Sequence, residues 1–92
     1  MIIKNFVVLT EAIEAVKKYG DRCQIVKTIE EMAELSVQLA KNLNDIETTD
    51  IEGEIADVII MMESMKVIFP KWEDAYERKV SKLKTHLENG TK

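Results

Sequence analysis

The fold is decided by two stretches of this sequence, VKTIEEMAELSVQLAKN at residues 26–42 and GEIADVIIMMESMK at residues 53–66. In both stretches apolar residues recur every three or four positions, which is typical of amphipathic helices. Carboxylates stand among these apolar positions, namely Glu30, Glu31, Glu34, Glu54 and Asp57. A carboxylate on a buried helix face is costly unless a positive charge neutralises it. The pattern therefore predicts two packed helices whose acidic residues share a bound divalent cation.

Four helices are expected along the chain. The first spans about residues 10–19 and ends before Gly20, a common C-terminal signal. The second begins after Asp21, with Gln24 in a capping-box arrangement, and continues to about residue 44. The third runs over about residues 51–68 behind a second capping box at residues 49–52, and the fourth is opened by Pro70 and runs to about residue 88. Residues 6–9 either extend the first helix or pack as an arm.

The second helix is apolar on two sides, so we expect it to have two packing partners. One stripe is expected to face the core of the chain itself and the other a second subunit. The two stripes consist of Val26, Ile29, Ala33, Ser36 and Ala40, and of Met32, Leu35, Leu39 and Leu43. On the third helix, Glu54 stands near the middle of an apolar face and Glu63 is expected to point to solvent. That face consists of Ile55, Val58, Ile59, Met62 and Met65.

Length and composition agree with a single helical domain. The chain has 92 residues, 3 Gly and 1 Pro, and it shows no linker or internal repeat. An all-helical chain of this size often gains core by oligomerising. We therefore expect one domain over residues 1–92 with an all-α fold, an antiparallel bundle of about four helices that is completed by homo-oligomerisation as a homodimer or homotetramer.

Charge and cysteine content exclude several classes of protein. The 13 basic and 17 acidic residues give a net charge of -4, which argues against a broad nucleic-acid-binding face. The single cysteine, Cys23, rules out an intramolecular disulfide framework and fits a reducing compartment. No signal peptide is recognisable, and the longest apolar run, residues 58–62, is too short to span a bilayer. We therefore expect a soluble cytoplasmic protein with no membrane or nucleic-acid partner.

The acidic residues are expected to converge between the second and third helices. Residues three or four positions apart share a helix face, so Glu30 stacks on Glu34 with Glu31 beside them, and Glu54 pairs with Asp57. The short connection between the two helices favours antiparallel packing, which brings both groups together. A carboxylate site without His or Cys suits Mg²⁺, with Mn²⁺ as the alternative, and such a site commonly holds phosphate. A solvated acidic stripe is the competing interpretation of EExxE taken alone.

The order EExxE, a spacer and then ExxD resembles the all-α nucleoside triphosphate pyrophosphohydrolases of the MazG type. The segments EEMAEL and GEIADVIIMMESMK are especially similar to the corresponding sequences of small phage and Firmicute members of that family. The later segment ERKVSKL, residues 77–83, resembles the family's basic segment and places Lys79 and Lys82 at its positively charged positions. The resemblance covers roughly residues 26–87. It implies Mg²⁺-dependent conversion of a nucleoside triphosphate into a monophosphate and pyrophosphate, with a role in nucleotide-pool housecleaning.

The resemblance also implies roles for individual residues. Glu30, Glu34, Glu54 and Asp57 are expected to be the main metal ligands. Glu31 is expected to bind a second metal or to orient the attacking water, so that Glu31 and Glu34 are the candidates for catalysis. Lys79 and Lys82 are expected to bind the phosphates of the substrate, although surface salt bridges explain these lysines equally well. The alternative function is a non-enzymatic helical dimerisation module, which explains the two apolar stripes but not Glu54.

Overall fold

The structure, a computed structural model, describes residues 8–90 of the chain. This part of the chain folds into four α-helices without any strand: α1 (Thr10–Tyr19), α2 (Asp21–Leu43), α3 (Ile51–Ile68) and α4 (Trp72–Glu88). The all-α class expected from the sequence is confirmed. α1 begins at Thr10 and is not extended by Val8 or Leu9, whereas Phe6 and Val7 lie outside the described residues.

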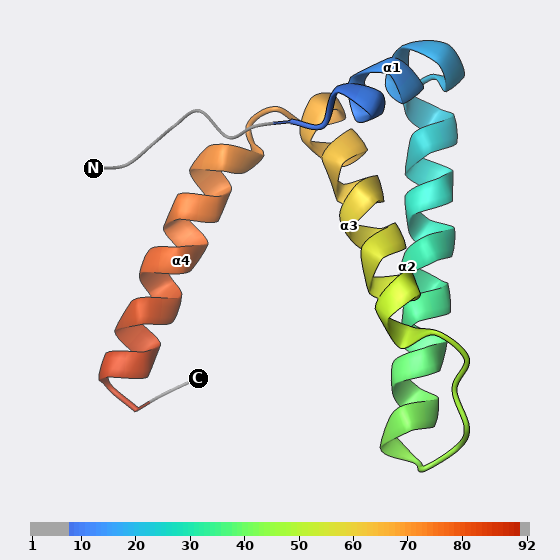
Figure 1. Ribbon diagram of the computed structural model, residues 1–92. Helices are drawn as coiled ribbons and strands as arrows, with labels where there is room; N and C mark the ends of the chain where they lie inside the picture. Colours follow the sequence, from blue (N-terminus) through green and yellow to red (C-terminus); the bar gives the residue numbers. More distant parts are fainter. Residues whose placement is uncertain (1–7, 91–92) are drawn as a thin grey trace.

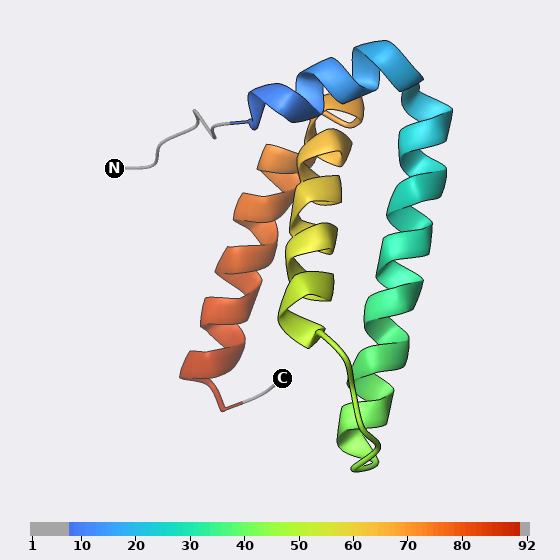
Figure 2. The same ribbon diagram turned by 45° about the vertical axis from the view of Figure 1, so that its right-hand side comes forward.

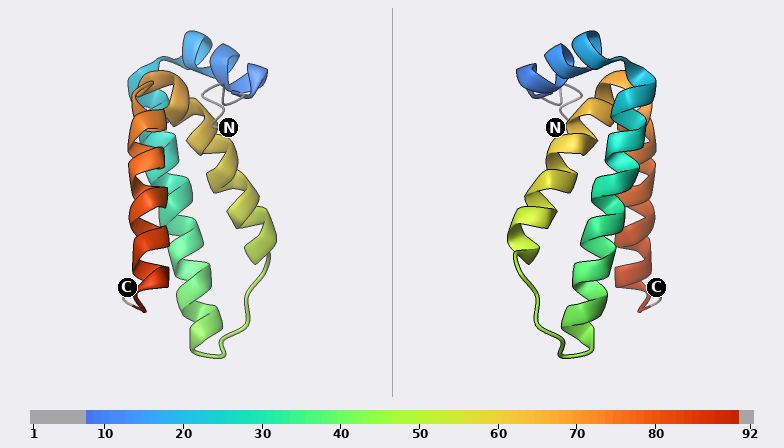
Figure 3. Two further views of the ribbon diagram at one scale, coloured as in Figure 1. Left: turned by 90° about the vertical axis from the view of Figure 1, so that its left-hand side faces the viewer. Right: turned by 90° about the vertical axis from the view of Figure 1, so that its right-hand side faces the viewer.

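α2 and α3 form an antiparallel hairpin, as the short connection at residues 44–50 predicts (Figure 1). α1 lies across the end of this hairpin where α2 begins and α3 ends, and it contacts both helices. α4 starts beside the end of α3 and then diverges from the hairpin (Figure 1), so it does not pack along any other described helix. It lies near α3 and α2 only in the projections of Figures 2 and 3. One chain therefore forms a three-helix unit with an outlying fourth helix rather than a closed four-helix bundle.

The helix ends differ from the sequence prediction in detail. Gly20, with φ of 89°, is the N-cap of α2, so the capping box expected at Asp21 and Gln24 is wrong. The N-cap of α3 is Asp50, one residue later than in the capping box expected at residues 49–52, so that capping box is also wrong. The Asp50 carboxylate accepts a hydrogen bond from the Gly53 N–H at 3.0 Å. A Cβ at position 53 would collide with that carboxylate, so the glycine makes room for the cap. α4 begins at Trp72, two residues after Pro70.

The seam between α2 and α3 is largely polar, contrary to the sequence prediction. The buried residues of α2 are Gln24, Thr28 and Glu31, and those of α3 are Met61 and Ser64. The Ser64 hydroxyl donates a hydrogen bond of 2.9 Å to Gln24 Oε1 in the buried interior. Neither apolar stripe of α2 supplies a buried residue, so the expectation that one stripe would face the core of the chain is wrong.

Apolar side chains remain exposed over much of the molecule. Among the described residues, Ala12 and Met61 are the only buried hydrophobic side chains. Ile29 is 61% exposed on α2 and Ile59 is 58% exposed on α3, although both belong to predicted apolar faces. The radius of gyration is 16.1 Å, whereas a compact domain of this length has a radius of about 12 Å. None of the described helices is long and apolar enough to cross a membrane.

Glu63 connects α1 to α3 and is not the solvated residue that the sequence suggested. Its carboxylate accepts a hydrogen bond from the Leu9 backbone N–H at 2.9 Å and pairs with Lys66 at 2.6 Å. The Lys66 ammonium in turn lies 4.9 Å from the centre of the Trp72 ring at the start of α4. These contacts join α1, α3 and α4 at one end of the molecule.

Glu63→Gln is expected to reduce the loss of stability in acid. The hydrogen bond from Lys66, followed by that from Leu9, lowers the pKa of Glu63 from its ordinary value of 4.5. The ionised carboxylate therefore stabilises the fold above pH 4.5, and this contribution is lost as the pH falls through the lowered pKa. Urea unfolding of both proteins between pH 3 and pH 7 measures the effect. If the free energies of unfolding of the wild type and the variant fall in parallel below pH 4.5, this prediction is contradicted.

Candidate metal centre

The register of the α2–α3 hairpin decides which acidic residues meet. The hydrogen bond between Ser64 and Gln24 aligns the two helices near one end. Seven residues further along α2 is Glu31, and seven residues back along α3 is Asp57. Seven residues make about two helical turns, so both side chains return to the seam at the same height. Antiparallel packing thereby brings two separate acidic motifs to one place.

Glu31, Glu54 and Asp57 form a compact carboxylate cluster. Each residue offers one oxygen, and the three oxygens lie within 4.8 Å of one another. Glu31 is buried, Glu54 is half-buried and Asp57 is exposed, so the cluster opens to solvent on the Asp57 side. Glu31 Oε1 and Glu54 Oε2 are fully enclosed and accept no hydrogen bond. Buried polar atoms usually have a hydrogen-bond partner, so these two oxygens require an explanation.

Negative charge dominates the surroundings of the cluster. The charge of Glu31, a side-chain hydrogen bond with Glu31 and, more weakly, the charge of Glu54 raise the pKa of the neighbouring Glu34. Lys27 Nζ lies 3.1 Å from Glu31 Oε2, one helical turn away on α2. This contact raises the pKa of Lys27 through its hydrogen bond to Glu31 and the charge of Glu31. A single lysine beside four carboxylates leaves an excess of negative charge that a divalent cation would offset.

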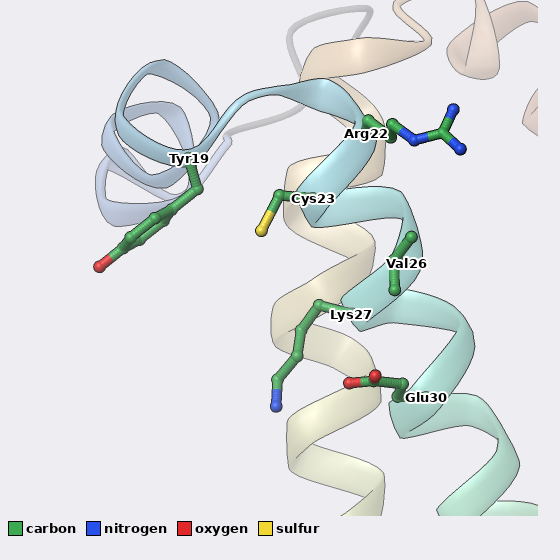
Figure 4. A pocket seen from close by; sticks show the side chains of 6 residues that line it. All are labelled: Tyr19, Arg22, Cys23, Val26, Lys27 and Glu30. Carbon is green, nitrogen blue, oxygen red and sulfur yellow. The ribbon is translucent and has the colours of Figure 1, made fainter.

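The remaining predicted site residues lie elsewhere. Glu30 is exposed and lines an open groove beside Lys27 (Figure 4), and it is not part of the three-residue cluster. The cluster therefore contains Glu31 and neither Glu30 nor Glu34, although these two were expected among the main metal ligands. Lys79 and Lys82 are exposed on α4, which diverges from the hairpin, so a single chain does not bring these lysines to the cluster.

Lys27 is the residue that the sequence interpretation missed. Its position four residues before Glu31 is a sequence signal for an ion pair along one helix. Lys27 also lines the groove together with Glu30, which is three residues further along α2. The contact of Lys27 with the acidic cluster is recognised only from the structure, in which Glu31, and not Glu30, is the acid at the α2–α3 seam.

The donor set of the cluster is chemically suited to a hard divalent cation. Three carboxylate oxygens from two helices provide charged ligands, and the exposed side leaves room for water or for phosphate oxygens. Exposed acidic groups also gather without metal, but the enclosed and unpartnered oxygens of Glu31 and Glu54 set this cluster apart from a solvated stripe. The arrangement therefore fits Mg²⁺ or Mn²⁺ bound at the α2–α3 seam.

Comparisons with protein-family models, with curated proteins and with solved structures gave no match to this chain.

Proposed function

We propose that this protein is a Mg²⁺-dependent nucleoside triphosphate pyrophosphohydrolase. The observation that carries the proposal is the pair of enclosed carboxylate oxygens, Glu31 Oε1 and Glu54 Oε2, in a cluster completed by Asp57. An apolar or hydrogen-bonded seam would be more stable for a purely structural hairpin, because unpaired buried charge is destabilising. A divalent cation satisfies these oxygens and offsets the repulsion between them. The resemblance of both acidic motifs to MazG-type enzymes supplies the reaction.

The roles follow from where the residues lie. Glu31, Glu54 and Asp57 would hold the cation, Mg²⁺ or alternatively Mn²⁺. A bound cation would stabilise the negative charge that develops on the phosphate oxygens. Glu34, whose pKa is raised by Glu31, orients the attacking water and accepts its proton. Water adds to the α-phosphorus, the bond from that phosphorus to the bridging oxygen breaks, and the monophosphate and pyrophosphate leave.

A second copy of the chain is part of this proposal. The hairpin leaves apolar side chains exposed on both helices, and large exposed apolar patches mark interaction sites. Two adjacent helices of this length present an area on the order of the 800 Å² per partner that a stable interface needs. Another copy carries the same faces and matches them through two-fold symmetry. Lys79 and Lys82 bind phosphate only in an assembly in which α4 of one copy covers the hairpin of the other.

The exposed apolar faces also favour the alternative, a non-enzymatic helical dimerisation module. A dimerisation module accounts for Ile29 and Ile59 being exposed in one chain. It gives no reason for enclosing the single oxygens Glu31 Oε1 and Glu54 Oε2 without a hydrogen-bond partner. Turnover of a triphosphate decides between the two functions, because both predict a dimer.

Glu31→Gln, Glu54→Gln and Asp57→Asn are each expected to reduce pyrophosphate release by about 100-fold or more, because each removes a charged ligand of the metal. The assay screens canonical and modified nucleoside triphosphates with Mg²⁺. Glu52→Gln, on the exposed side of α3, is the matched control and should keep wild-type activity. The absence of pyrophosphate release from every triphosphate with the wild-type protein would favour the dimerisation module.

Mg²⁺ is expected to stabilise the wild-type fold, by about 2.7 kcal/mol at one hundred times the dissociation constant, since it binds only the folded state. Glu54→Gln should be at least as stable as the wild type without metal, because it removes an enclosed charge, and it should gain little from Mg²⁺. Thermal melting with EDTA and with Mg²⁺ measures both effects. Equal metal-dependent shifts in the two proteins would place the ion elsewhere.

Ile29→Glu and Ile59→Glu are expected to convert the oligomer into monomers. Both side chains are more than half exposed in one chain, so either substitution would hardly disturb an isolated monomer. Sedimentation velocity gives the assembly state, and melting at several protein concentrations gives the coupling between folding and association. A wild-type protein that sediments as a monomer and melts independently of concentration would contradict the second copy.

A further inference from the structure

Lys27 stands at the border between the acidic cluster and an open groove. On the cluster side its ammonium lies 3.1 Å from Glu31 Oε2. On the other side it lines a groove of about 530 Å³ between the end of α1 and α2 (Figure 4). The groove is lined by Tyr19, Arg22, Cys23, Val26, Lys27 and Glu30. No other described residue belongs to both places.

We propose that Lys27 is a phosphate-binding residue. When Glu31 binds the metal ion, the Lys27 ammonium gives up its ion pair with Glu31 and binds the polyphosphate of a nucleotide instead. This inference rests on the proposed function, because it requires a metal at Glu31. It adds a substrate-binding residue that the two acidic motifs do not contain.

The charge balance favours such an exchange. Without an ion, Glu31 attracts Lys27 because its carboxylate is the nearest anion. A divalent cation on the same carboxylate offsets its charge and repels the ammonium, so the ion pair becomes weaker. The negative charges of Glu30 and Glu34 also favour the charged form of Lys27. A phosphate bound to the ion then offers a stronger acceptor than a metal-bound carboxylate does.

The position and freedom of the side chain allow the exchange. The Lys27 side chain is 54% exposed, whereas that of Glu31 is 10% exposed, so the lysine moves while the acid stays. A Mg²⁺ ion holds its oxygen ligands at about 2.0–2.1 Å, which makes a phosphate oxygen a direct neighbour of the Glu31 oxygen. Lysine has a flexible stem and needs to shift by only a few ångströms to reach that neighbour.

Lys27 also differs from the two lysines that the sequence singled out. Lys79 and Lys82 belong to α4, which diverges from the cluster within one chain. Lys27 is on the same helix as Glu31 and requires no second copy. If the Lys27→Met substitution weakens phosphate binding in a monomeric protein, the effect therefore comes from Lys27 and not from the lysines of α4.

The test compares Lys27→Met with the wild type in two binding measurements, using Mn²⁺ alone and then inorganic tripolyphosphate at saturating Mn²⁺. Titration calorimetry reports both affinities without any turnover and without a choice of base. Lys27→Met should bind Mn²⁺ about 3-fold more tightly, because a competing cation is gone. It should bind tripolyphosphate about 10-fold or more weakly, because a charge-assisted hydrogen bond is lost.

Two further variants control the result. Lys27→Arg keeps the charge and should retain most of the tripolyphosphate affinity. Lys41→Met makes the same change fourteen residues along α2, about 21 Å away, and should alter neither affinity. Melting curves without metal verify that each variant folds as the wild type does.

Two results would overturn the inference, and they are distinguishable. Tighter Mn²⁺ binding by Lys27→Met with unchanged tripolyphosphate affinity would reduce Lys27 to a counter-charge for Glu31, while the metal site stands. A wild-type protein that binds neither Mn²⁺ nor tripolyphosphate would overturn the proposed function and this inference with it.

Discussion

Two carboxylate oxygens enclosed between α2 and α3 without a hydrogen-bond donor constrain the whole molecule. Glu31 Oε1 and Glu54 Oε2 come from different helices, so the tertiary packing itself brings like charges together. Repulsion and desolvation both disfavour this arrangement in the absence of a counter-ion. The hairpin would be more stable with apolar residues at these positions. Retaining the acids makes sense for a chain whose folded state is completed by a cation, and the proposed hydrolysis of triphosphates follows from the chemistry of such a cation.

The polar seam has a second consequence, because the apolar residues then face outward. Gln24, Thr28 and Ser64 occupy positions that hydrophobic side chains fill in most helical hairpins, and the Gln24–Ser64 hydrogen bond aligns the two helices. The larger aliphatic side chains of both helices remain on the exterior, where they are free to contact another chain. A second copy would supply the hydrophobic core that one chain lacks. The proposed metal site and the proposed association surface thus occupy different sides of the same two helices.

Much of the local structure was predictable from the sequence. The spacing of apolar residues, together with Gly20 and the polar segment at residues 49–52, predicted helix bounds that agree closely with the observed ones. The convergence of the two acidic motifs was also predictable, since a short connection favours antiparallel packing. The choice among adjacent acids was not predictable. One residue turns the side chain by about 100° around a helix, so Glu31 lies at the seam while Glu30 faces the groove.

The sequence by itself determined that this chain is helical, where its helices lie, and that two acidic motifs occupy otherwise apolar segments. These are local properties, set by periodicity and by the residues at helix ends. Only the tertiary structure decided which face of α2 is buried, that Lys27 joins the cluster, and that α4 diverges from the hairpin. These features depend on the register of helices distant in sequence. That register comes from specific pairings such as Ser64 with Gln24, which a pattern of apolar residues does not encode.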